Sequence, residues 1–579
     1  MWRSVLAVLA LAGAGVAYFI NLLLTKRRRL DGLPQPPSSR IWGHLQLAGQ
    51  CQSLFPPKVH VQNWIHYIQK KHNLGDVFYI DWWPFGPQWV FIADPELASK
   101  YITTGQSLPK SLLTSGYVDR LLGKDNMVCI EGQKWKMLRS IFNPGFSASH
   151  LMSLVPYMLD SSLVFVNACR KKADTNELFQ MDRLATRYAI DIIGKITMDT
   201  DFNSQTSPHP IVETFRNQIN LLPITSVSRF EDLNPIRPIL LWFNTRKLNS
   251  LIGQEVDKRI AARNLPGQTN GDKKKPSSTK SRSRSVLDLA LDAYENDHLT
   301  NLTGKAQSRD FSTSFRATLV DTLKTFIFAG HDTTSATISY TLYLLHLHPQ
   351  VQKKATAELE SVYGTNCTPE SIAAEIRTQP HSINKLEYLG AIIKETLRLF
   401  PPASTLRAIL SEDGVKDFFL PDPKTNQSYP MRGFDIWPIA HLIHRNEAYF
   451  PEPVKFIPER FLPSETPFPD AKLFTPAGKD AWRPFEKGPR NCIGQELAMM
   501  EIKIVLACVV GEVDFTAEFD GRKIDSWTSV ETVDEFADGR PGVERMTIEG
   551  HYAYQVLSGA ANPAGAMPGR LRLRERRGK

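Results

Sequence analysis

Cysteine is scarce in this sequence, and the spacing of what there is excludes two common uses. The 579 residues include six cysteines, too few for the disulfide framework of a small secreted scaffold. No Cys-x-x-Cys pair occurs, so zinc-binding and thioredoxin-like chemistry have no basis. Only Cys492 has neighbours that indicate a chemical role. The others are expected to be buried or incidental thiols in a reducing compartment: Cys51, Cys129, Cys169, Cys367 and Cys508.

The sequence also lacks a nucleotide-binding signature and a concentrated basic surface. No Gly-x-Gly-x-x-Gly segment is present, so no flavin- or nicotinamide-binding region is expected within the chain. The net charge is +9, but the cations cluster in residues 26–29, 272–284 and 570–579, and the remainder is net acidic. This distribution argues against a nucleic-acid groove.

One long apolar run lies near the N-terminus. Residues 5–24 are apolar except for Asn21, and a helix of this length, roughly 30 Å, crosses the hydrocarbon core of a bilayer. A cleaved signal peptide is the alternative, but four cations follow at 26–29, where a small-residue cleavage site would be expected. These cations place the following domain on the cytoplasmic side.

Hydrophobic periodicity predicts a protein that is mainly α with a small β portion. Length alone suggests two or more domains, but the pattern after the anchor indicates one. Helical spacing is found at 187–198, 313–346, 351–363 and 385–399. Residues 79–83 and 89–93 predict a β-hairpin, and strand-like pieces return near 435–439 and in the last sixty or so residues.

These features predict the following organisation. A short flank (1–4) precedes the transmembrane anchor (5–24) and a basic, proline-rich hinge (25–45), because prolines stiffen the chain there. A catalytic domain (46–560) follows, interrupted by a basic, Lys/Ser-rich loop at 266–285. A basic tail (561–579) ends the chain.

The strongest chemical signal is Phe-Glu-Lys-Gly-Pro-Arg-Asn-Cys-Ile-Gly at residues 485–494. Cys492 precedes a helix-like run whose N-terminal dipole favours a thiolate. Gly488 permits a tight loop, and Gly494 removes a side chain where a flat group could lie. Arg490 supplies a cation for an anionic group. A buried thiol would explain Cys492 alone, but the combined pattern favours a ligand.

This segment resembles the haem-binding loop of the cytochrome P-450 family. The family's Phe-x-x-Gly-x-Arg-x-Cys-x-Gly pattern is matched in full by Phe485, Gly488, Arg490, Cys492 and Gly494. The resemblance covers nearly the whole chain. It implies the P-450 fold and a haem b whose iron takes Cys492 as its axial thiolate, a ligand that favours O–O cleavage.

A second signal, Phe-Ile-Phe-Ala-Gly-His-Asp-Thr-Thr, occupies residues 326–334 within a long apolar helix. Gly330 costs about 1 kcal/mol there relative to Ala, and Asp332 and Thr333 need partners if buried. We expect the helix to widen locally, so that a hydroxyl meets a ligand instead of its own backbone. The resemblance places this segment over the haem, with Asp332 and Thr333 as the catalytic, proton-delivering residues.

The resemblance also assigns a structural trio. Glu395 and Arg398 lie one helical turn apart, which alone indicates an ordinary surface ion pair. The family pairs such a Glu-x-x-Arg with a later segment, here Phe-Ile-Pro-Glu-Arg-Phe at 456–461. Arg460 becomes the third member, and the trio is expected to hold the loop of Cys492.

Four side chains are candidates for binding the haem propionates. Trp135 and Arg139 lie four residues apart on one helix face, and the resemblance directs both at these carboxylates. Arg407 and Arg490 are further candidates, because a planar guanidinium suits a carboxylate.

The resemblance therefore implies a membrane-bound haem-thiolate monooxygenase of the endoplasmic reticulum. Its electrons would come from NADPH through a separate reductase, with cytochrome b5 as a second candidate partner. The sequence looks most like fungal members that oxidise secondary metabolites such as aromatic polyketides, and sterols or fatty acids are the alternative substrates. We expect the pocket to be formed by 111–126, 202–222, 321–328 and 403–406.

Two other functions remain open. One is an isomerase or dehydratase on the same fold that does not use dioxygen, against which the Asp332–Thr333 pair argues. The other is a membrane-tethered haem-binding module without turnover.

Overall fold

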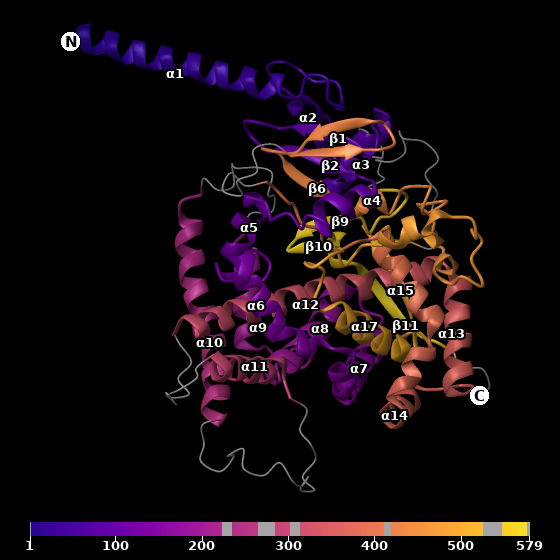
Figure 1. The fold of residues 1–579 in the computed structure, drawn as a ribbon. Helices are drawn as coiled ribbons and strands as arrows, with labels where there is room; N and C mark the ends of the chain where they lie inside the picture. The colour runs from indigo at the N-terminus through magenta and orange to yellow at the C-terminus, as the bar shows by residue number, and fades with distance from the viewer. Residues whose placement is uncertain are drawn as a thin grey trace.

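A computed structural model of the chain describes residues 2–222, 234–263, 284–301, 313–409, 418–524 and 547–575. Helix α1 (Trp2–Arg28) projects away from the remainder (Figure 1). Its most apolar stretch has a mean hydropathy of 2.1 and no residue buried in the protein. By length and composition α1 is a candidate transmembrane span, and it contains the predicted anchor. Helix α7 (Ala148–Thr175) is also long and apolar, but half of its apolar stretch is buried in the domain.

The last turn of α1 is fixed to the catalytic domain. The buried Arg27 forms an ion pair with Asp81, at the end of strand β1 (Val77–Asp81). Arg27 also donates to the carbonyl oxygen of Trp83 at 2.7 Å. A buried pair with several hydrogen bonds holds a defined geometry. The predicted hinge therefore includes a rigid attachment at its start.

Helix α12 (Thr313–Leu347) forms the centre of the domain (Figure 1). Most of its 35 residues are buried, as expected for a helix that is covered on all sides. It packs against α8 (Met181–Met198), α15 (Glu387–Leu399) and α17 (Gln495–Val509). These helices and α13 (Pro349–Tyr363) confirm the predicted helical spans.

The remaining helices surround this centre. They are α2 (Leu45–Leu54), α3 (Val61–Lys71), α4 (Pro95–Leu97), α5 (Leu112–Leu122), α6 (Gly132–Phe142), α9 (Pro210–Asn220), α10 (Ile236–Arg263), α11 (Val286–Asn301), α14 (Pro369–Thr378) and α16 (Ala440–Ile443).

The β portion is small and lies in several short sheets. Strand β1 pairs antiparallel with β2 (Gln88–Ile92), which confirms the predicted hairpin, and β2 pairs in parallel with β6 (Asp435–Pro438). This sheet lies at the end of the domain nearest α1 (Figure 1). The other strands are β3 (Phe179–Gln180), β4 (Phe419–Asp422), β5 (Gln427–Pro430), β7 (Val513–Phe519), β8 (Arg522–Lys523), β9 (Gln555–Ser558), β10 (Ala560–Pro563) and β11 (Pro568–Leu573).

The prediction of a basic tail from residue 561 is wrong for most of the described part of that segment. Residues of β10 and β11 belong to sheets, and β11 lies between β3 and β7. Arg570, counted as tail charge, pairs with Glu518 of β7 at 2.8 Å. The domain thus continues beyond 560, because sheet pairing outweighs the basic composition that suggested a tail. Nearly all of the predicted loop at 266–285 lies outside the described residues.

Helices α8 and α12 approach each other closely at Gly330. A Cβ atom added to Gly330 would lie 2.7 Å from Cγ1 of Ile193. Carbon atoms do not approach this closely without displacement. The glycine that sequence analysis placed against the haem is thus also required for helix packing.

Gly330→Ala is expected to destabilise the holoprotein by about 1–3 kcal/mol through overpacking. Gly116→Ala in α5 is the matched control, because a Cβ there has no atom within 4 Å and alanine is the better helix former. Thermal unfolding of both variants in detergent tests this. Equal midpoints for the two would show that the contact with Ile193 is unimportant.

Candidate active site

A cavity of about 280 Å³ lies between α12 and the loop that precedes α17. Cys492 and Phe485 contribute from that loop, Thr333 from α12, and Trp135 from α6. Residues separated by more than three hundred positions thus meet at one enclosed space, which is the usual form of a ligand site.

The loop that carries Cys492 is held in one conformation. The amide of Cys492 donates to the carbonyl of Phe485 at 2.9 Å. Gly488 has a φ of 86°, and a Cβ there would collide with the carbonyl of Thr103, so the tight turn predicted for this glycine is present. At Gly494 the nearest atom to an added Cβ is Sγ of Cys492, at 3.9 Å. The space beside the sulfur is therefore open.

The thiol of Cys492 is enclosed by the protein, yet its surface is accessible because it faces the cavity. Burial raises the pKa of this thiol, while the amide of Gly494 and the charge of Arg139 act in the opposite direction. A metal cation facing the sulfur is the additional partner that would keep it as a thiolate.

Arg490 lies at the rim of the cavity. It forms an ion pair with Glu131, donates to the carbonyl of Val128 at 2.8 Å, and stacks over the ring of Trp135 at 4.6 Å. Trp135 and Arg490, predicted separately for the same carboxylate group, thus touch each other.

Arg407 and Lys110 add two buried cations to this region. Arg407 is 0 % exposed and donates through Nη1 to the carbonyl of Leu108 at 2.8 Å. Its Nε and Nη2 have no hydrogen-bond partner among the residues that the structure describes. Burial, with the charges of Arg407 and Arg490, lowers the pKa of Lys110 well below its ordinary value. Unpaired buried donors of this kind require anionic ligands.

The donor set therefore fits a haem. Cys492 offers the sulfur ligand for its iron, and Arg407, Arg490 and Lys110 offer cations for two propionates. Lys110 was missed by sequence analysis because a single lysine outside a motif carries no signal. Its hydrogen-bond partner, Thr405 at 2.8 Å, and the two arginines whose charges lower its pKa come from other parts of the chain.

Arg139 lies on the same cavity wall as Lys110 and Arg490. Its guanidinium donates to the carbonyl and side-chain oxygens of Asn491, at 2.9 and 3.0 Å. Arg139 also lines the cavity, so its binding of a haem propionate stays a prediction. The side chain braces the loop beside Cys492, because Asn491 offers two oxygens in the plane of the guanidinium.

The two catalytic candidates on α12, Thr333 and Asp332, face different parts of the protein. Thr333 lines the cavity, and its hydroxyl donates to the carbonyl of Ala329 at 2.8 Å. The predicted widening of the helix is wrong, since α12 is continuous and this hydroxyl bonds its own backbone. Asp332 faces strand β10, where its carboxylate accepts from the amide of Ala560 at 2.5 Å and from Asn562 at 3.0 Å.

Asp332 is buried in this second environment. Burial raises its pKa, and His331 and the two hydrogen bonds from β10 oppose the rise. Its side chain is not among the described residues that line the cavity. Asp332 thus attaches β10 to α12, a role that the sequence pattern did not predict.

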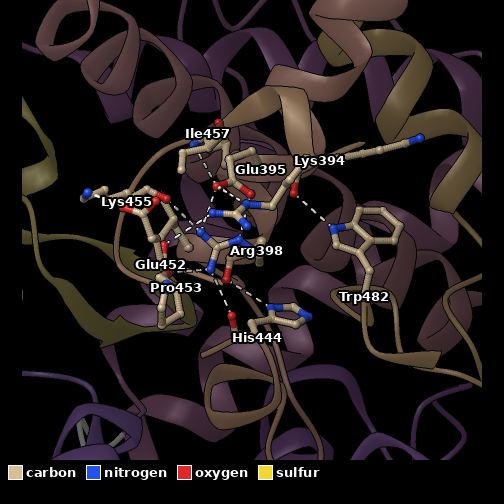
Figure 2. A network of polar contacts seen from close by, with 12 residues as sticks. Lys394, Glu395, Arg398, His444, Glu452, Pro453, Lys455, Ile457 and Trp482 are labelled. Atoms are coloured by element: carbon tan, nitrogen blue, oxygen red, sulfur yellow. Dashed lines mark hydrogen bonds and ion pairs between the residues drawn. The ribbon is translucent and has the colours of Figure 1, made fainter. Parts of the chain in front are cut away.

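Glu395 joins Arg398 and Arg460 in a fully buried network (Figure 2). Its carboxylate accepts from Arg398 at 2.7 and 2.8 Å and from Arg460 at 3.0 Å. The amide of Ile457 donates to the same carboxylate at 2.9 Å. Burial would raise the pKa of Glu395, but the two guanidinium groups hold it below its ordinary value.

The network reaches the loop of Cys492 through the backbone. Arg398 donates to the carbonyls of His444, Pro453 and Lys455, at 2.9, 2.6 and 3.0 Å (Figure 2). The ring of His444 in turn accepts from the amide of Arg483 at 3.0 Å. Arg483 immediately precedes the loop, so the trio holds the segment from which Cys492 is presented.

The pocket segments expected from the sequence are only partly correct. Residues of 321–328 and 403–406 line the cavity, whereas none of 111–126 and 202–222 does so among the described residues. Glu501 of α17, which no motif indicated, lines it instead. The apolar pattern of the sequence shows burial, but it does not show which buried segment faces the cavity.

Comparison with known proteins gives one family. The model for Cytochrome P450 matches residues 34–530. Cytochrome P450 monooxygenase acrF of Aspergillus aculeatus is 36% identical over 89% of this chain and 98% of its own length. Cytochrome P450 monooxygenase polC of Polytolypa hystricis is 30% identical over 99% and 96%. The crystal structure of the cytochrome P450DA heme domain has a TM-score of 0.62 at 18% identity, covering 94% of this chain and 98% of that one. This structural similarity shows that the chain has the fold of that haem domain.

Glu395→Gln is expected to destabilise the protein by about 3–5 kcal/mol, because it leaves two buried guanidinium groups without their counter-charge. Retained haem should fall with it, since the loop of Cys492 loses its support. Glu213→Gln is the control, because its ion pair with Arg216 is about half exposed on both sides and is worth less than about 1 kcal/mol. Thermal midpoint and haem content are the measurements. A normal haem content in Glu395→Gln would show that the haem site does not depend on this network.

Proposed function

Because the chain belongs to the cytochrome P450 family and is a monooxygenase of that family, we propose that it inserts one oxygen atom from O₂ into a lipophilic organic substrate. The observation that carries this proposal is the position of Cys492 and Thr333 on the wall of one cavity. Next to Lys110 of that wall lies Arg407, which is buried and has two nitrogen atoms without a partner among the described residues.

The bound haem supplies the oxygen chemistry. Cys492 would hold its iron as a thiolate, and Arg407, Arg490 and Lys110 would hold its propionates. Arg139 and the backbone of Phe485 keep the cysteine loop in place. These groups are positioned before substrate binds, so no reorganisation is needed during the reaction.

The hydroxyl of Thr333 can hold a proton donor at the cavity wall. Its hydroxyl donates to Ala329, which leaves the oxygen free to accept a hydrogen bond from a group in the cavity. A threonine in this arrangement holds a proton donor next to the reacting oxygen. Proton delivery of this kind typically contributes about 10²–10⁴-fold to a rate.

The cavity wall supports a lipophilic substrate. Apolar side chains such as Ile193, Phe326 and Leu397 form much of it, with hydroxyls at Thr325 and Ser404. Such a surface binds an apolar molecule that carries a few polar groups. The similarity to fungal monooxygenases is compatible with a secondary metabolite as substrate. We take aromatic polyketides as the first candidate class, and sterols and fatty acids as the competing classes.

Electron supply and location follow from the same proposal. The sequence contains no nucleotide-binding glycine motif, so the electrons come from NADPH through a separate reductase, with cytochrome b5 as a second candidate partner. Helix α1, with Lys26, Arg27 and Arg28 in its last turn and Arg29 after it, supports a single span in the endoplasmic reticulum, with the domain on the cytoplasmic side.

Cys492→Ser is expected to abolish the long-wavelength Soret band of the reduced, carbon-monoxide-bound protein in membranes. Cys367→Ser should keep the band, because this half-buried thiol is not among the described residues of the cavity. Persistence of the band in Cys492→Ser would remove this residue as the ligand. Its absence from well-folded, haem-loaded wild type would favour a haem-binding module without turnover.

Thr333→Ala is expected to retain haem and to release peroxide at the expense of product, with coupling lowered about tenfold or more. Thr325→Ala, another cavity hydroxyl on α12, should stay within about twofold. Emodin, ergosterol and lauric acid serve as aromatic polyketide, sterol and fatty-acid probes, with NADPH and purified reductase. Tight coupling in Thr333→Ala would exclude its role. Product formed without NADPH would favour an isomerase or dehydratase.

A further inference from the structure

Six hydroxyl side chains line the cavity in the described part of the chain, and four of them already donate their proton within the protein. The hydroxyls of Thr325, Thr333 and Thr337 donate to backbone carbonyls of α12, at 2.9, 2.8 and 2.8 Å. Thr334 donates to the carboxylate of Glu501 at 2.7 Å. Because a hydroxyl has one proton, these four groups can only accept a hydrogen bond from a bound molecule.

Ser404 and Thr405, in the segment after α15, are arranged in the opposite way. The Oγ of Ser404 accepts from Nε1 of Trp437 at 2.6 Å, and Oγ1 of Thr405 accepts from Nζ of Lys110 at 2.8 Å. Neither hydroxyl donates to an acceptor among the residues that the structure describes. Their two protons are therefore available to a ligand.

The partner of Ser404 fixes the direction of this donor. The N–H of an indole donates and cannot accept. Trp437 lies on β6, is 5 % exposed, and packs against Trp89 and Phe91 of β2 with ring centroids 5.6 and 5.8 Å apart. Since the ring is held in place, a lone pair of Ser404 is committed to it and the O–H bond points elsewhere. Ser404 is an exposed residue of the cavity wall, so the cavity is where its proton meets an acceptor.

The two available hydroxyls serve different ligands. Thr405 is bonded to Lys110, which pairs through its backbone with Arg407, and these cations are assigned to the haem propionates. Ser404 has no cation among its hydrogen-bond partners. A single neutral donor suits a neutral oxygen atom, because a carboxylate removed from water needs a charged partner.

The surroundings of Ser404 make its hydrogen bond selective. Pro402 and Ala403, directly before it, also line the cavity. In such apolar surroundings a hydroxyl that finds no acceptor is costly, and one that finds an acceptor forms a stronger bond than it would in water. A hydrocarbon bound against this wall therefore leaves a donor unsatisfied, whereas a molecule with a suitably placed oxygen does not.

We propose that Ser404 donates a hydrogen bond to a neutral carbonyl oxygen of the substrate, and that Trp437 is the positioning residue that orients it. This rests on the proposed function and narrows its substrate to lipophilic ketones and quinones, a description that aromatic polyketides fit. A ketone oxygen only accepts, whereas a sterol hydroxyl must also place its own proton. A fatty acid presents a carboxylate, for which Ser404 offers no charge.

The test uses fluorenone and fluorene, which share one tricyclic shape and differ in a carbonyl against a methylene group. Dissociation constants for both are measured with ferric, full-length holoprotein in one detergent, by optical titration and by equilibrium dialysis. Wild type should bind fluorenone about three- to tenfold more tightly than fluorene, the usual size of one neutral hydrogen bond. In Ser404→Ala this ratio should fall close to one.

Control variants separate the donor from the shape of the wall. Thr325→Ala removes a wall hydroxyl that donates to its own helix, so the ratio should stay within about twofold of wild type. Ser404→Thr keeps a hydroxyl and should retain the preference. Both variants and Ser404→Ala should keep the haem content and the carbon-monoxide band of wild type.

An infrared spectrum reports on the hydrogen bond directly. Fluorenone labelled with a heavy isotope at its carbonyl carbon gives a C=O band that can be separated from those of the protein by difference. This band should lie at lower frequency in wild type than in Ser404→Ala, because a carbonyl that accepts a hydrogen bond is weakened.

The outcomes distinguish this proposal from the proposed function. Equal affinities for the two probes in wild type, no binding of fluorenone, or an unchanged ratio in Ser404→Ala would overturn the role of Ser404. Loss of haem in Ser404→Ala with the ratio retained would assign its proton to a propionate instead. Binding is measured without turnover, so these results stand apart from the proposed function, which fails if wild type lacks the thiolate band or oxidises no probe.

Discussion

The site depends on one buried carboxylate. Glu395 binds two arginines and a backbone amide, and one of those arginines, Arg398, is satisfied by three carbonyl oxygens of the segment that leads to the cysteine loop. Desolvating these charges is costly, and only complete hydrogen bonding offsets that cost. Through His444, which accepts from the amide of Arg483, the network supports the segment that presents Cys492.

The cavity has a second constraint, the close approach of α8 and α12. Gly330 allows the helices to touch, and the same helix presents Thr333 to the cavity and Asp332 to β10. Adjacent residues of a helix point about 100° apart. Neighbouring polar residues in one motif therefore serve different surfaces. The pairing of Asp332 with Thr333 in the sequence does not imply that both face a ligand.

The cations near the cavity differ in whether other groups of the protein already bind them. Arg407 is buried with two nitrogen atoms that have no partner among the described residues, whereas Arg490 is paired with Glu131 and Arg139 donates to Asn491. An unpaired buried donor requires an anionic ligand. This criterion distinguishes Arg407 from the cations that already have partners, a difference that the sequence does not show.

Much was determined by the sequence alone: the apolar anchor, the central helices, the β1–β2 hairpin and the glycine turn beside Cys492. These follow from local periodicity and from backbone conformations open only to glycine. Tertiary structure alone decided the rest. Lys110 and Glu501 belong to none of the motifs identified in the sequence. The segment after residue 560 forms strands that pair with β9 and β7, and Asp332 faces β10. Each depends on partners distant in the chain, and local pattern carries no information about which distant groups will meet.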